Sequence, residues 1–222
     1  IFEGQYFDEF NEKIHVCEPF VIPKEWRRYR AIDYGLDMLA GVYVAVNSEG
    51  RAYVYREVAE SNLPISSAAR KILDACESDE EFYITLAPPD LWNRRNDTGR
   101  SAADIFAEHG VYLARATNNR VQGWYDLKEW LHPIKDEQGE KTARIKFFRN
   151  CTEIIHCLPL LMFDEKNPND VSKEPHNITH APDAIRYFVA GHPLPAVAET
   201  KATEYQNRRD SYSNQMQSLL EY

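Results

Sequence analysis

The sequence predicts an α/β fold in which one mixed β-sheet is covered by helices on both faces. Three apolar segments follow one another between residues 29 and 58 with only turns between them, which indicates an antiparallel meander. Further along the chain, apolar strands alternate with helical periodicities, which is typical of parallel crossover connections. A chain of 222 residues can bury one substantial core, so a single domain is expected.

The meander is predicted from three short segments. The first strand is the sequence YRAIDY, residues 29–34, and it ends at Gly35. The second covers residues 41–47 and the third residues 52–58, and the turn sequence Ser-Glu-Gly separates them. Such a turn between two apolar segments predicts that the second and third strands form a hairpin.

The later elements are predicted from apolar periodicity and from proline or glycine boundaries. Helices are expected over residues 65–76, 101–108, 121–130, 150–158 and 179–190, strands over 81–86 and 111–114, and a loop over 164–178. A polar turn at 135–140, between Ile134 and the segment 143–148, predicts an added β-hairpin. This order of elements is that of the ribonuclease H-like fold.

The chain is predicted to have three parts. Residues 1–28, which contain two prolines, are expected to be an entry segment or linker with little regular structure. Residues 29–193 form the folded domain, and residues 194–222 form a polar tail that is mobile or depends on a partner. Because the sequence begins at Ile1 without a Met, we expect it to be a piece of a longer protein.

Composition excludes several classes of protein. A net charge of −9 argues against a protein that coats nucleic acid through bulk electrostatics, although carboxylates that hold cations are compatible with a nuclease. The 4 cysteines lack the spacing of a zinc site and are expected to be reduced. No apolar run approaches the roughly 20 residues that span a bilayer. The sequence contains no GxxxxGK[ST] motif, so ATP hydrolysis by that route is excluded.

Three aspartates stand at positions that suit a metal site. Asp33 closes the first strand, Asp90 follows the fourth, and Asp183 lies in the first turn of the last helix. Each alone also has a structural explanation, because aspartate is common at strand ends, in turns and at helix N-termini. In a ribonuclease H-like sheet the fourth strand lies beside the first, so the strand-end acids would converge. Together the three carboxylates predict a site for two Mg²⁺ or Mn²⁺ ions that hydrolyses phosphodiesters.

Two neighbouring side chains were weighed beside these acids. His180 precedes Asp183 by three residues and can share its face of the helix. It would complete the shell of one ion and favour Mn²⁺, or else serve as a capping or surface histidine. Asp37, in the turn after the first strand, is expected to reach an ion only through water.

The segments AIDYG, PPDLWNRR and THAPDAIRYF, between about Arg30 and Gly191, resemble the nuclease domain of tailed-phage terminase large subunits. The resemblance implies metal-dependent cleavage of concatemeric double-stranded DNA in the host cytoplasm, with Asp33, Asp90 and Asp183 as ligands and His180 as an auxiliary residue. It also implies an upstream ATPase motor domain and, as partners, a portal or procapsid and a small terminase subunit. Thr179 departs from the pattern, because many members carry an acid there.

Basic residues near these motifs are candidates for contacts with DNA phosphates. They are Arg94, Arg95, Arg100 and Arg120, and on the predicted hairpin Lys141, Arg144 and Lys146. In related domains an added hairpin lies beside the active site and can gate DNA entry. The alternative for both groups is a solvated charged surface.

Two other functions fit the same residues. One is a Holliday-junction resolvase or a transposase-type nuclease of the same fold, which the acidic net charge disfavours. The other is a docking module with structural acids, in which the tail 194–222 binds a portal or procapsid protein.

Overall fold

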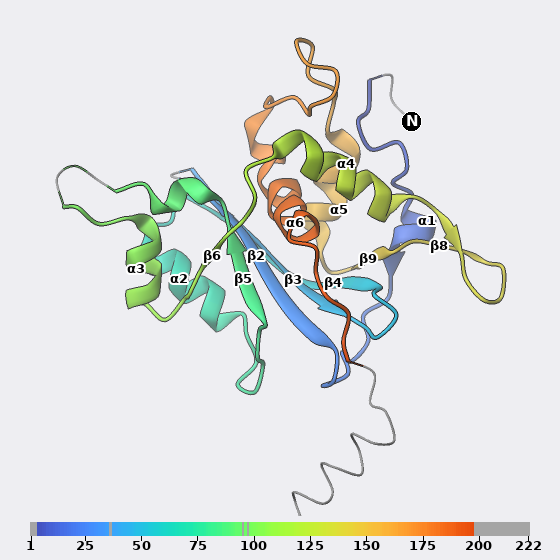
Figure 1. The fold of residues 1–222 in the computed structure, drawn as a ribbon, viewed down its shortest axis with the longest axis horizontal. Coiled ribbons are helices and arrows are strands. Elements are labelled where there is room, and N and C mark those ends of the chain that lie inside the picture. Colours follow the sequence, from blue (N-terminus) through green and yellow to red (C-terminus); the bar gives the residue numbers. More distant parts are fainter. Residues whose placement is uncertain (1–3, 36, 95, 97, 198–222) are drawn as a thin grey trace, which may run out of the picture.

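A seven-stranded sheet forms the centre of the computed structural model, which describes residues 4–35, 37–94, 96 and 98–197 (Figure 1). The strand order is β1-β9-β4-β3-β2-β5-β6. The strands are β1 (Val16–Cys17), β2 (Arg27–Tyr34), β3 (Met38–Val46), β4 (Ala52–Ser61), β5 (Ile84–Ala87), β6 (Ala114–Arg115) and β9 (Ile145–Phe148). β2, β3 and β4 are antiparallel neighbours, while β5, β6, β9 and β1 are added in parallel. The predicted meander with parallel additions is therefore confirmed.

Helices cover both faces of this sheet, as predicted (Figure 1). α2 (Ile65–Asp74) and α3 (Ala102–Glu108) lie on one face. α4 (Arg120–Leu131), α5 (Thr152–Cys157) and α6 (His180–Ala190) lie on the other. Short 3₁₀ turns complete the element list: η1 (Pro89–Trp92), η2 (Leu158–Leu160) and η3 (His176–Ile178).

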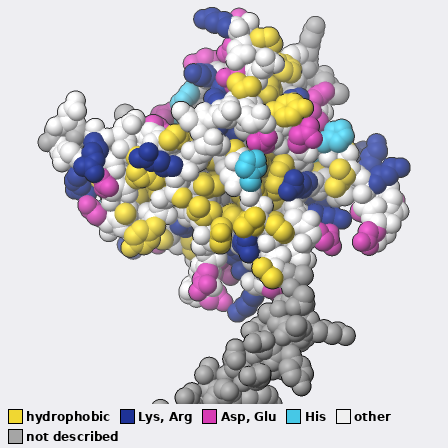
Figure 2. All heavy atoms as spheres, viewed as in Figure 1, with side chains coloured by type: hydrophobic (Ala, Val, Ile, Leu, Met, Phe, Trp, Pro, Cys, Tyr) yellow, Lys and Arg dark blue, Asp and Glu magenta, His cyan; other side chains and the backbone are white. Residues whose placement is uncertain are grey.

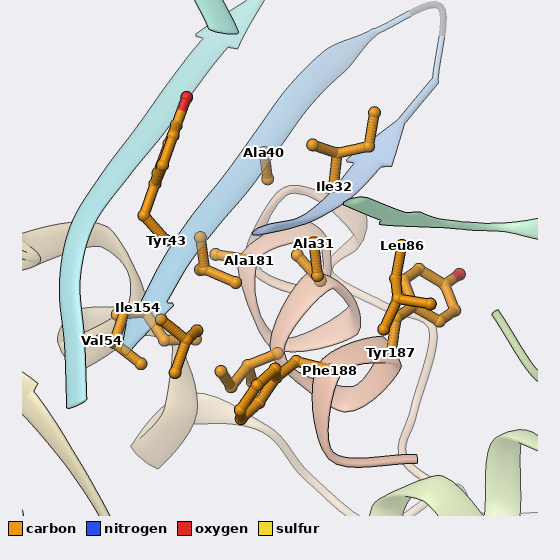
Figure 3. Close-up of a cluster of buried hydrophobic side chains, with 14 of the residues drawn as sticks. Ala31, Ile32, Ala40, Tyr43, Val54, Leu86, Ile154, Ala181, Tyr187 and Phe188 are labelled. Atoms are coloured by element: carbon orange, nitrogen blue, oxygen red, sulfur yellow. The ribbon is translucent and has the colours of Figure 1, made fainter. Parts of the chain in front are cut away.

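The alternation of side chains along β2 decides which residues face which helices. Ala31 lies against α6, together with Ala181 and Phe188, whereas Ile32 and Tyr43 point to the opposite face (Figure 3). The hydroxyl of Tyr43 donates to the carbonyl of Ile72 in α2, 2.7 Å away. Asp33 is two residues after Ala31, so the same alternation puts its carboxylate on the face of α6.

The added hairpin is shorter than predicted. It consists only of β7 (Ile134–Lys135) and β8 (Lys141–Thr142), whereas residues 145–148 leave it and form β9 beside β4. Ile145 and Phe147 are fully buried there, and a peripheral hairpin offers no place to bury both. The assignment of residues 143–148 to the hairpin is therefore wrong, and Lys146 belongs to the main sheet.

The segment before β2 has more regular structure than predicted. It contains α1 (Glu12–His15), and β1 pairs in parallel with β9. Phe7 is fully buried, with its ring centroid 5.9 Å from that of Trp124 in α4. The expectation of little regular structure is wrong for this segment, because its aromatic side chains supply apolar surface that the sheet and α4 bury.

The chain that follows α6 runs back along β2. The hydroxyl of Tyr29 donates to the carbonyl of Leu194 and accepts from its backbone N–H, each at 2.9 Å. Most of the predicted tail, residues 198–222, lies outside the described residues. Within the described part of the chain, no helix combines the length and the apolar character that a membrane crossing requires.

Candidate metal centre

Asp33 lies at the end of β2 under the first turn of α6, because strand alternation turns it toward that helix. Its Oδ2 atom is 2.8 Å from Nδ1 of His180. Its Oδ1 atom accepts a longer hydrogen bond, 3.4 Å, from the hydroxyl of Tyr187. Both contacts join the strand-end acid to residues of α6, so the helix fixes the direction of the carboxylate.

Asp183 stands one helical turn from His180, in the first turn of α6. Its side chain is largely buried, and Arg186 of the same helix pairs with it. Burial raises the pKa of the Asp183 carboxyl, Arg186 opposes this, and the charge of Asp33 raises it further. The two carboxylates are therefore electrostatically coupled in the absence of a cation.

Asp90 reaches the same end of the sheet by another route. It lies in η1 directly after β5, and β5 is the parallel neighbour of β2. Burial and then the charges of Asp33, Asp183 and Asp90 raise the pKa of the Tyr187 hydroxyl, while Arg186 opposes them. Tyr187 thus experiences the charges of all three predicted acids.

His180 bridges two carboxylates. Its side chain is only 4% exposed, with Nδ1 on Asp33 and Nε2 3.2 Å from Oδ2 of Asp37. The hydrogen bond to Asp33 is the main cause that raises the pKa of His180, against the opposing effect of burial. The predicted proximity of His180 to the acids is consistent with this geometry.

The structure adds a residue that sequence reasoning missed. Nδ1 of His176 is 2.9 Å from Oδ2 of Asp37, the same oxygen that faces His180. Asp37 was expected to act only through water, yet it contacts two histidines directly. The spacing H-x-x-x-H between His176 and His180 was the available signal, since four residues are about one helical turn.

The three predicted acids are more widely spaced than this histidine cluster. Among the described residues, only Asp37, His176 and His180 form a group whose donor atoms all lie within 4.8 Å of one another. Asp33, Asp90 and Asp183 nevertheless fit divalent cations, because their oxygens are hard ligands and Arg186 is paired with only one of them. A divalent ion would relieve the repulsion between Asp33 and Asp183.

The predicted DNA contacts near the acids differ in availability. Arg94 is exposed and donates to the carbonyl of Gly99. Arg100 pairs with Glu108, and Arg120 pairs with Asp170. Arg95 lies outside the described residues. Arg120 is thus already held within the protein, whereas Arg94 has more freedom to meet a phosphate.

The basic residues of the hairpin region lie apart from the acids. The hairpin β7–β8 projects beyond the C-terminal end of α4, far from the turn between β2 and β3 (Figure 1). Lys141 is exposed there, and the guanidinium of Arg144 lies 4.0 Å from the ring centroid of Trp130. On the face drawn in Figure 2, Lys and Arg side chains form separate groups and no single basic patch.

Comparison with known proteins gives a structural match. No protein-family model matches the sequence, and no curated protein matches it. The nuclease domain of the bacteriophage P22 large terminase superposes with a TM-score of 0.65 at 19% identity, covering 85% of this chain and 92% of that domain. This chain has the fold of a large-terminase nuclease domain.

Two further large terminases share this fold. The nuclease domain from bacteriophage SPP1 with bound Mn matches with a TM-score of 0.55 at 16% identity, over 82% of this chain and 95% of that one. A complete large terminase from a thermophilic bacteriophage matches with a TM-score of 0.67 at 19% identity, over 85% of this chain. The chain spans 44% of the length of that protein.

Proposed function

We propose that this chain is the nuclease domain of a tailed-phage terminase large subunit. In this proposal it cleaves concatemeric double-stranded DNA by hydrolysis with two Mg²⁺ or Mn²⁺ ions. The observation that carries the proposal is the group of Asp33, Asp90 and Asp183 around the Tyr187 hydroxyl, at one end of the sheet. The SPP1 domain of the same fold contains Mn, which supports a metal-dependent site.

Each residue of the site has a task in this proposal. Asp33, Asp90 and Asp183 hold the ions, which activate the attacking water and stabilise the leaving oxygen when bound. Arg186 orients the Asp183 carboxylate through two donors. His180 fixes Asp33 through its Nδ1 atom, and it is a candidate ligand itself.

The proposed partners follow from the same fold. We expect an ATPase motor domain upstream, and a small terminase subunit and a portal or procapsid as partners in the host cytoplasm. With a net charge of −9 and scattered basic groups, the isolated domain should hold DNA weakly. Tethering to a motor that grips DNA would raise the effective DNA concentration at this site.

Plasmid cleavage tests the proposal. The wild type and the variants Asp33→Ala and Asp90→Asn are incubated with supercoiled DNA and Mn²⁺, Mg²⁺ or chelator. Asp90 is the cleaner position, because its side chain is exposed and lies at the surface end of the site. Asp74→Asn is the matched control, since Asp74 makes only an exposed ion pair with Arg70 on α2.

We expect nicking by the wild type and by Asp74→Asn with metal, and none by the site variants or with chelator. Equal nicking by wild type and Asp90→Asn would remove Asp90 from the site. A strong preference for branched over linear DNA would indicate a resolvase instead. Metal-independent cleavage, or a folded wild type that binds no metal and cuts no DNA, would favour the docking module with structural acids.

A further inference from the structure

We propose that Asp37, His176 and His180 form a separate cation site that takes a borderline divalent ion such as Zn²⁺, Co²⁺ or Mn²⁺ in preference to Mg²⁺. This inference does not rest on the proposed nuclease function. It concerns which ion binds at the turn between β2 and β3, and direct binding measurements can test it.

The donor atoms already converge on one point. Oδ2 of Asp37 lies 2.9 Å from Nδ1 of His176 and 3.2 Å from Nε2 of His180. All three ligand positions lie within 4.8 Å of one another. A tetrahedral ion with bonds of about 2.0–2.2 Å keeps its donors about 3.4 Å apart. Two pairs are therefore near the required spacing, and the third can close by small rotations of exposed side chains.

His180 is held in the orientation that a ligand needs. Its ring is buried, and its Nδ1 atom is fixed by Oδ2 of Asp33 at 2.8 Å. Donation from Nδ1–H to Asp33 leaves the lone pair on Nε2, which faces Asp37. A carboxylate that orients a metal-binding histidine through its other nitrogen is a common arrangement around metal ions.

The other two donors lie on the solvent side of this fixed ring. His176 is 57% exposed and Asp37 55% exposed, so both can adjust to an entering ion. The rings of His176 and His180 meet edge to face at 4.5 Å. Gly35 makes room for Asp37, because a Cβ atom at Gly35 would stand 2.7 Å from Oδ1 of Asp37.

Hydrogen bonding alone gives a weak reason for this arrangement. Exposed ion pairs contribute about 0–1 kcal/mol, because solvent screens them and holding the side chains costs entropy. Two imidazoles and one carboxylate instead match the preference of Zn²⁺, Co²⁺ and Mn²⁺ for mixed nitrogen and oxygen ligands. Mg²⁺ favours oxygen ligands and retains its waters, so it should avoid this cluster and bind among the three acids.

Calorimetric titration of chelator-treated protein with ZnCl₂ and MgCl₂ tests the proposal. The variants are His176→Ala, Asp37→Asn and Asp90→Asn, with His156→Ala as the control, because His156 is an exposed histidine on α5. We expect the wild type to bind Zn²⁺ with an affinity that falls at least about 10-fold in His176→Ala and Asp37→Asn. His156→Ala and Asp90→Asn should retain this binding, and excess Mg²⁺ should not displace the Zn²⁺.

Equal Zn²⁺ affinity in the wild type and His176→Ala would overturn the site. Loss of Zn²⁺ binding in Asp90→Asn would also overturn it, because the ion would then belong to the three acids. Since plasmid cleavage plays no part in this measurement, failure of the cation site and failure of the nuclease proposal give different results. Co²⁺ absorption provides a second readout, because its visible bands change when imidazole nitrogens replace water.

Discussion

Arg186 donates from two nitrogens to a single oxygen of Asp183, with Nε at 2.8 Å and Nη2 at 2.7 Å. The pair is almost fully enclosed, and the guanidinium also lies 5.0 Å from the ring centroid of Trp124. Its third nitrogen, Nη1, is buried without a hydrogen-bond partner. Arg186 is therefore held by the direction of Asp183 and by the aromatic ring beside it.

Arg186→Met should destabilise the metal-free protein by about 3–5 kcal/mol, because Asp183 would be left as a buried charge without its partner. Urea denaturation at pH 7 measures this loss. The double variant Asp183→Leu with Arg186→Met should recover most of it, because an apolar pair leaves no charge to solvate. A double variant no more stable than Arg186→Met would show that the loss comes from packing.

Gly123→Ala should destabilise the protein although alanine is the better helix former. A Cβ atom at Gly123 would stand 2.8 Å from Cγ of Arg186. Overpacking costs about 1–3 kcal/mol, which exceeds the gain of up to about 1 kcal/mol in helix propensity. Urea denaturation gives the sign. Displacement of Arg186 should also slow plasmid nicking, and an unchanged rate in a destabilised variant would show that Asp183 keeps its place.

Divalent ions should stabilise the fold through the three acids. At a free Mn²⁺ concentration of about 100 times Kd, binding to the folded state alone adds about 2.7 kcal/mol. Thermal denaturation with and without Mn²⁺ measures the shift. Asp90→Asn should reduce the shift caused by Mg²⁺, whereas Asp74→Asn should not. A Mg²⁺-induced shift of equal size in Asp90→Asn and wild type would contradict ligation by Asp90.

Stability should fall on mild acidification because of His15. Burial lowers the pKa of this imidazole below its usual value of 6.5, and Nε2 lies 2.8 Å from the carbonyl of Leu131. The unfolded chain therefore binds a proton at a higher pH than the folded chain. The contribution is fully present above pH 6.5 and is lost as pH falls through the folded pKa, by at most about 1.4 kcal/mol per pH unit.

An NMR titration of the His15 ring checks this directly. A midpoint below 6.5 is expected, and a midpoint at or above 6.5 would contradict it. His156 is exposed and serves as the internal reference. Urea denaturation at pH 7.5 and pH 5.5 should show the matching loss of stability in the wild type.

Much of the arrangement around the acids followed from local sequence patterns. Alternation along β2 placed Asp33 on one face, and prolines after β5 stopped that strand just before Asp90. Both rules act over a few residues, so the sequence alone could support them. The placement of β5 beside β2 needed in addition the strand order of a known fold.

The missed features depend on contacts between distant residues. Pairing of Ala52 with Ile145 puts β9 in the sheet, and no local pattern distinguishes such a strand from a hairpin arm. Burial of Phe7 against Trp124 orders the segment before β2 through a contact of the same kind. His176 was missed because its meeting with Asp37 requires the β2–β3 turn and η3 to be placed in three dimensions.

The paired hydrogen bonds between Tyr29 and Leu194 have a mechanical consequence. Tension applied to the chain beyond Leu194 would be carried by the Tyr29 ring into β2, and only in part by α6. β2 is flanked by β3 and β5, so its ladders bear such a load in shear. Because Asp33 sits four residues further along the same strand, a partner could pull on the C-terminal segment without moving the acids.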